Sequence, residues 1–62
     1  MPLILSPNLP DADGCYDTIL AAHDGLSEEE SAALNARLIL ILANHIGDGE
    51  VIREALEAAR DT

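Results

Sequence analysis

The segment of residues 27–46 constrains the fold of this chain more than any other part of its 62-residue sequence. It begins with Ser27 followed three residues later by Glu30, which is the capping-box pattern at the start of a helix. Gly47 supplies a C-terminal stop. On a helical wheel the segment is apolar on nearly every side, although a surface helix needs an apolar stripe only about 100° wide. The sequence therefore predicts a central helix with more apolar surface than a small monomer covers.

Shorter helical patterns lie on both sides of this segment. The preceding one begins with aspartates, which accept hydrogen bonds from the free N–H groups of a first turn, and it ends in a glycine. The following one begins at Asp48 and repeats apolar side chains at helical spacing. We therefore expect one all-α domain over residues 1–62, with three helices, short, long and short, at 11–25, 27–46 and 48–60.

The first ten residues form a unit of a different kind. Pro2, Pro7 and Pro10 lack an N–H group and bias the residue before each of them away from the helical region. The residues between them are mainly apolar, and a free extended arm of this content would expose apolar surface. We expect the arm, residues 1–10, to lie across helices of its own chain or of a neighbour. It lacks the basic n-region of a signal peptide, so the expected location is the cytoplasm.

A chain of this size has difficulty in supplying its own core. Domains of about 60 residues bury only about 60% of the surface of the unfolded chain, and aromatic residues make up just 2% of this sequence. Association with a second copy would cover the central helix. We therefore predict a symmetric homodimer. Its predicted interface consists of Leu34, Asn35, Leu38, Ile39, Ile41, Leu42, His45 and Ile46.

Two polar residues lie within the apolar arc of the central helix. A single amide at the position of Asn35 is typical of residues that fix helix register across an interface. His45 falls in the last turn, where the helix dipole favours a partial positive charge. We expect a packed imidazole that caps a carbonyl group or reaches a carboxylate of a partner. A metal-binding or acid–base role is the alternative for His45.

The charge of the chain excludes two classes of partner. There are 12 acidic and 3 basic residues, for a net charge of -9. Nucleic acids and anionic membranes both require Lys and Arg side chains against phosphates, so we expect neither as a partner. The charge is spread fairly evenly, at -4, -2 and -3 over residues 1–26, 27–46 and 47–62. A basic protein partner is the alternative to a merely solvated surface.

Few residues suggest catalysis. His23 and Asp24 form an HD pair of the kind that HD hydrolases use for metal, but those sites need further histidines, and only His45 remains. Cys15 would also need a histidine and an orienting group nearby to act as a nucleophile. We therefore expect no catalytic residue, no metal and no cofactor. A metal-dependent or acid–base enzyme that uses His23, Asp24 and His45 is kept as an alternative.

The run ESAALNARLILILANHIGD, from Glu30 to Asp48, is distinctive. With Tyr16, Asp17 and the trailing Ala/Glu/Arg helix it resembles a small bacterial protein family of unknown function, over nearly the whole chain. The resemblance implies a bacterial, cytoplasmic, all-helical accessory protein and no particular activity. We predict a non-enzymatic, acidic protein-interaction module that forms homodimers. An obligate small subunit of another bacterial enzyme is the remaining alternative.

Overall fold

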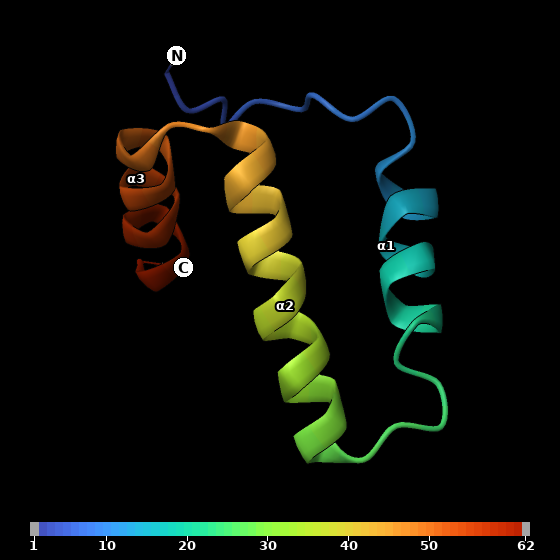
Figure 1. Cartoon of the computed structure of the whole chain (residues 1–62). Coiled ribbons are helices and arrows are strands. Elements are labelled where there is room, and N and C mark those ends of the chain that lie inside the picture. The colour runs from blue at the N-terminus through green and yellow to red at the C-terminus, as the bar shows by residue number, and fades with distance from the viewer. Residues whose placement is uncertain (1, 62) are drawn as a thin grey trace.

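The computed structural model describes residues 2–61, and in this range it contains three helices and no strand. The helices are α1 (Ala12–Ala21), α2 (Glu28–Ile46) and α3 (Gly49–Arg60). Figure 1 shows α2 in the centre, with α1 and α3 on opposite sides of it and both running antiparallel to it. The predicted all-α fold with a short, a long and a short helix is confirmed.

Each helix begins at a residue whose side chain satisfies free backbone N–H groups. Asp11 accepts a hydrogen bond from the N–H of Gly14 at 3.0 Å. Ser27 and Glu30 form both halves of the predicted capping box, with N···O distances of 3.2 and 2.9 Å. Asp48 accepts from the first turn of α3. The starts predicted from the sequence are therefore found within one or two residues.

The end of α1 differs from the prediction. The helix ends at Ala21, so the expected range 11–25 ends four residues too late. The next residues form tighter turns, in which the N–H of His23 donates to the carbonyl of Leu20 at 3.0 Å. Gly25 then takes a left-handed conformation, with φ 78°. The helical pattern included His23, but its backbone lies beyond the last α-helical turn.

The connection between α2 and α3 consists of two residues. Gly47 is left-handed, with φ 70°, and its N–H donates to the carbonyl of Ala43, which closes α2. Asp48 follows at once as the N-cap of α3. This link leaves little slack, and α2 and α3 are the helices whose backbones approach within 8 Å of each other. Helix α1, in contrast, reaches α2 through side chains.

The chain is more open than a compact protein of its size. Its accessible surface is 5339 Å², whereas a compact folded chain of 6.6 kDa exposes about 3,900 Å². Its radius of gyration is 13.1 Å, against about 10.6 Å for a compact chain of this length. Among the described residues, Val51 of α3 is the one buried side chain, at 5% exposure. The single chain therefore encloses almost no core.

The arm adopts neither helix nor strand over residues 2–9. In Figure 1 it passes from the α2–α3 connection across the open end of the molecule to the start of α1. Leu3 is half-buried, but Ile4, Leu5 and Leu9 are exposed. Contact of the arm with a neighbouring copy stays a prediction.

Candidate interaction surfaces

An apolar groove lies between α2 and α3. We call it the α2–α3 trough. Ile39 and Leu56, on opposite walls, are 61% and 60% exposed, which is unusual for large apolar residues that face a common groove. The trough is lined by Ile39, Leu42, Ala43 and Ile46 of α2 and by Ile52, Ala55, Leu56 and Ala59 of α3.

The charged side chains of α3 do not line the trough, and three of them pair with one another. Arg53 forms ion pairs with Glu50, at 2.8 Å, and with Glu57, and none of the three lines the trough. The guanidinium group of Arg53 lowers the pKa of Glu50, and the two carboxylates raise the pKa of Arg53. The pairs are solvent-exposed, so they contribute little to stability. Because Glu50 and Glu57 are both paired with Arg53, neither carboxylate is left unpaired beside the trough.

A second apolar pocket separates α1 from α2. We call it the α1–α2 pocket. Its α2 wall is made by Leu34 and Leu38, which are half-buried. Its other wall consists of Thr18, Ile19, Ala22 and His23. The pocket shows that α1 covers only one side of the apolar circumference of α2.

One polar contact ties the α1 end to α2. The ring of His23 has Nδ1 at 2.8 Å from the carbonyl oxygen of Ile19 and Nε2 at 2.9 Å from Oδ1 of Asn35. Nδ1 must carry a proton to donate to the carbonyl. Nε2 of a neutral ring then accepts from the amide of Asn35, and Nε2–H of a charged ring donates to its oxygen. The side-chain amide of Asn35 can meet either requirement by turning over, so the contact joins the end of α1 to α2.

The residues of the predicted interface lie in different places in the structure: in the α2–α3 trough, in the α1–α2 pocket or on the exposed surface of α2. Ile39, Leu42 and Ile46 line the α2–α3 trough, whereas Leu34 and Leu38 line the α1–α2 pocket. Ile41 is exposed on α2. Asn35 is exposed in the single chain and has His23 of its own chain as a partner, so its role in register across an interface stays a prediction. The part of the trough contributed by α3 was absent from the predicted interface, although the apolar face of residues 49–60 is readable from the sequence.

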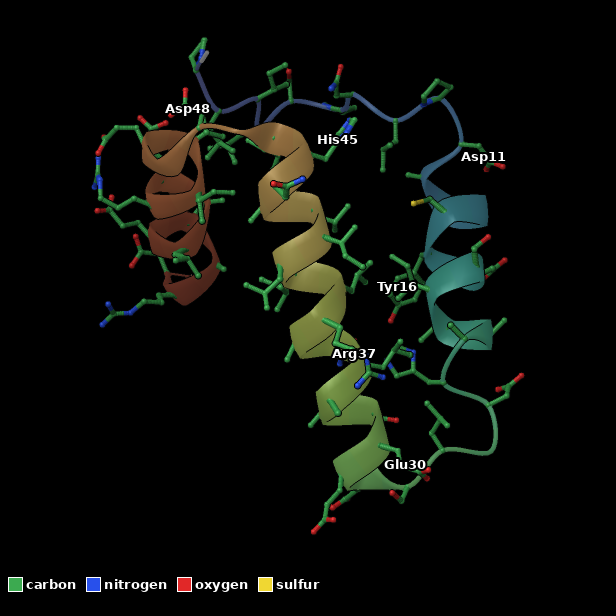
Figure 2. The ribbon with its side chains drawn as sticks, in the orientation of Figure 1. Asp11, Tyr16, Glu30, Arg37, His45 and Asp48 are labelled. Carbon is green, nitrogen blue, oxygen red and sulfur yellow. The ribbon has the colours of Figure 1, made fainter. Side chains whose placement is uncertain are left out.

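The residues considered for catalysis do not meet within one chain. His23 contacts Asn35, and His45 lies ten residues further along α2, a rise of about 15 Å. Figure 2 shows His45 near the arm, at the far end of α2 from Glu30. Within residues 2–61, no three His, Cys, Asp or Glu side chains converge in a way that could hold a metal ion. A site that uses both histidines would need a second chain.

The positions of the helices suggest a different grouping of the charges from the three segments 1–26, 27–46 and 47–62. Residues 1–30, which include α1, hold seven carboxylates and no Lys or Arg, for a charge of -7. Residues 31–62, which include the trough, hold five carboxylates and three arginines, for a charge of -2. The charge that looks evenly spread along the chain is therefore concentrated in α1, the turn after it and the first turn of α2.

Three helices with two open apolar grooves define the chain as a small all-helical protein with uncovered apolar surface. The chain belongs to the family described as "Protein of unknown function (DUF2783)", whose model matches residues 3–61. The predicted membership of a small family of unknown function is thereby confirmed. No curated protein and no solved structure matches the chain. None of the helices in the described part is both long and apolar enough to cross a membrane.

Proposed function

We propose that this protein is a non-enzymatic interaction module that forms a homodimer through the α2–α3 trough. The single observation that carries the proposal is the exposure of the trough, whose walls present large apolar side chains from two helices. Monomeric proteins seldom leave contiguous apolar surface of this kind open. The trough includes three residues of the predicted interface, Ile39, Leu42 and Ile46.

The surface area of the chain matches the need for a partner. Its accessible surface of 5339 Å² exceeds that of a compact chain of equal mass by about 1,400 Å². A stable interface of standard size buries about 800 Å² on each partner. One copy of the chain therefore has enough excess surface to form such an interface and still leave apolar area exposed.

The local charge favours a second copy in spite of the net charge of -9. The trough contains no charged residue. Between Ser31 and Gly47 the one charged residue is Arg37. Two troughs can therefore meet without placing carboxylates against carboxylates, which would cost affinity.

The symmetry of a dimer fits the shape of this surface. A two-fold axis places the same patch of both chains against itself. Two antiparallel α2–α3 pairs that face each other in this way form a core of four helices, an arrangement in which side chains of facing helices fill the interior. The exposed walls of each trough, including Leu42 and Leu56, would then become the interior of the dimer.

The experiment is sedimentation equilibrium at micromolar concentration with two matched variants. Ile39→Glu places a charge in the trough, and we expect the dissociation constant to rise at least about 100-fold because the charge would be desolvated without a partner. Leu40→Glu introduces the same charge at a residue that is 70% exposed and outside the trough. We expect it to leave the dissociation constant within about threefold of the unsubstituted protein.

Two results would contradict the proposal. One is an unsubstituted chain that sediments at 6.6 kDa throughout the concentration range and melts cooperatively. The other is a dimer that Leu40→Glu dissociates and Ile39→Glu does not, because the interface would then lie on another face of α2, about 100° around the helix.

A further inference from the structure

Helix α1 presents an apolar strip directly beside an acidic one. Tyr16 and Leu20 are four residues apart and 61% and 48% exposed. Asp13 and Asp17 are also four residues apart and exposed, and each lies three residues before a member of the apolar pair. Residues at these spacings are neighbours on a helix surface. We call the four residues the α1 strip, and Figure 2 shows the Tyr16 ring on the side of α1 that faces α2.

The carboxylates of the α1 strip have no Lys or Arg near them in the sequence, and the first such residue stands twenty positions after Asp17. No Lys or Arg occurs before Arg37, and the ion pairs between described residues that the structure shows at Arg53 belong to α3. Two aspartates four residues apart on a helix repel each other. A cation brought by a partner would relieve this repulsion.

A second copy is a poor occupant for this surface. It would bring an identical set of carboxylates, and the half of the chain that contains α1 already carries a charge of -7. Like charges opposed across an interface cost affinity. The α1 strip and the α2–α3 trough therefore favour different partners.

We infer that the α1 strip docks a basic amphipathic helix of an unlike protein. Apolar side chains of that helix would cover Tyr16 and Leu20, while Lys or Arg residues on its flank would pair with Asp13 and Asp17. An amphipathic helix laid against an apolar surface is a common mode of recognition. Tyr16 adds a ring face to which a cation is attracted.

This inference goes beyond homodimerisation, because it assigns a second surface and a partner of different chemistry. It does not require the trough to be occupied. The two surfaces lie on opposite sides of α2, as α1 and α3 do in Figure 1. A partner at the α1 strip would thus leave the trough free for the second copy.

The test uses the full-length protein and a fluorescein-labelled peptide of Leu and Lys, about 18 residues long, which forms five amphipathic helical turns. Binding is measured by fluorescence anisotropy in dilute buffer. The double variant Asp13→Asn/Asp17→Asn should weaken binding about fivefold, as expected for the loss of two exposed charge pairs. The matched variant Glu54→Gln/Asp61→Asn removes the same charge from the α3 side and should leave binding within about twofold.

Two further variants separate this inference from the proposed dimer. Leu20→Gln should also weaken the Leu/Lys peptide about fivefold, because it removes apolar contact at the strip. Ile39→Glu, which targets the trough, should leave peptide binding unchanged whether or not the protein is a dimer. The inference is overturned if both charge-neutralising pairs weaken binding equally, which indicates general attraction to an acidic chain. It is also overturned if Ile39→Glu abolishes binding and the α1 variants do not.

Discussion

The two outer helices are attached to α2 in different ways. Helix α3 follows α2 after two residues, has backbone within 8 Å of it and contributes the one buried side chain of the described residues, Val51. Helix α1 is separated from α2 by a longer turn and is held by the His23–Asn35 contact and a small apolar pocket. The difference indicates that α2–α3 is the stable scaffold and α1 the more loosely attached element.

The charges divide along the same line. Residues 31–62, which form α3 and most of α2, have a charge of -2, whereas residues 1–30, which form α1 and the first turn of α2, have a charge of -7 and contain no Lys or Arg. A near-neutral apolar surface suits a second identical chain, whereas an acidic one suits a basic partner. The comparison therefore connects local packing with the choice of partner at each side of the molecule.

The largest expected effect on the free energy of unfolding comes from a buried charge, placed in one variant on the α3 side of α2 and in another on the α1 side. Val51→Asp should destabilise the protein by about 3–5 kcal/mol, since the carboxylate would be buried without a partner. Leu38→Asp should cost less, because Leu38 is half-buried under the loosely attached α1. Urea unfolding at one fixed protein concentration measures both. Equal losses would show that α1 is packed as firmly as α3.

A smaller effect is expected at the connection between α2 and α3. Gly47→Ala should cost about 1–2 kcal/mol, because a side chain is strained at a φ of 70°. Gly49→Ala is the matched control, since a Cβ at that position meets open space and alanine is the better helix former. Thermal unfolding of the two variants gives the comparison. A similar melting temperature for both would mean that the left-handed turn is not needed.

The next effect concerns the hydrogen bond between His23 and Asn35, which joins the end of α1 to α2. Asn35→Leu removes the partner of His23 Nε2 and should cost about 1 kcal/mol. Hydrogen exchange should then become about fivefold faster in α1 and stay unchanged in α3. Asn44→Leu, which replaces an exposed amide elsewhere on α2, is the control. If Asn35→Leu changes the oligomeric state and leaves exchange in α1 unaltered, the amide acts across an interface, as the sequence suggests.

The smallest effect is electrostatic and belongs to the N-terminus of α2. The backbone N–H and the hydroxyl of Ser27 lower the pKa of Glu30. A lowered pKa in the folded state stabilises the protein at neutral pH, and this contribution is lost as the pH falls through the folded-state pKa. Glu30→Gln keeps a capping side chain without its charge. Its melting temperature should therefore be slightly lower at pH 7 and equal to that of the unsubstituted protein in strong acid, whereas Glu29→Gln should show less difference.

The sequence was sufficient for the elements whose signals are local. The capping box of Ser27 and Glu30, the N-cap at Asp48 and the closing Gly47 are found as predicted. The end of α1 was misjudged because periodicity alone assigned His23 to the helix. Its ring instead folds back to the carbonyl of Ile19 and reaches Asn35. A histidine and an asparagine on the apolar faces of neighbouring helices were a readable sign of this pair.

The surfaces were harder to predict than the helices. A helical wheel of α2 shows how much apolar area it has, but the choice of side covered by each neighbour depends on the connecting turns. The short connection at Gly47 and Asp48 brings Leu56 and Ile52 beside Ile39 and so creates the trough. The acidic character of the α1 side emerges only when α1 and the first turn of α2 are considered together.

The tight connection after α2 has a practical consequence. His45 lies in the last turn of α2, two residues before Gly47, and we expect a rotation of α3 to shift the backbone that carries this imidazole, because the link has only two residues. Occupancy of the neighbouring trough should then alter the proton resonances of the ring. We expect this ring to serve as an unlabelled reporter, so that a concentration series followed by proton NMR would test the proposed assembly without any engineered probe.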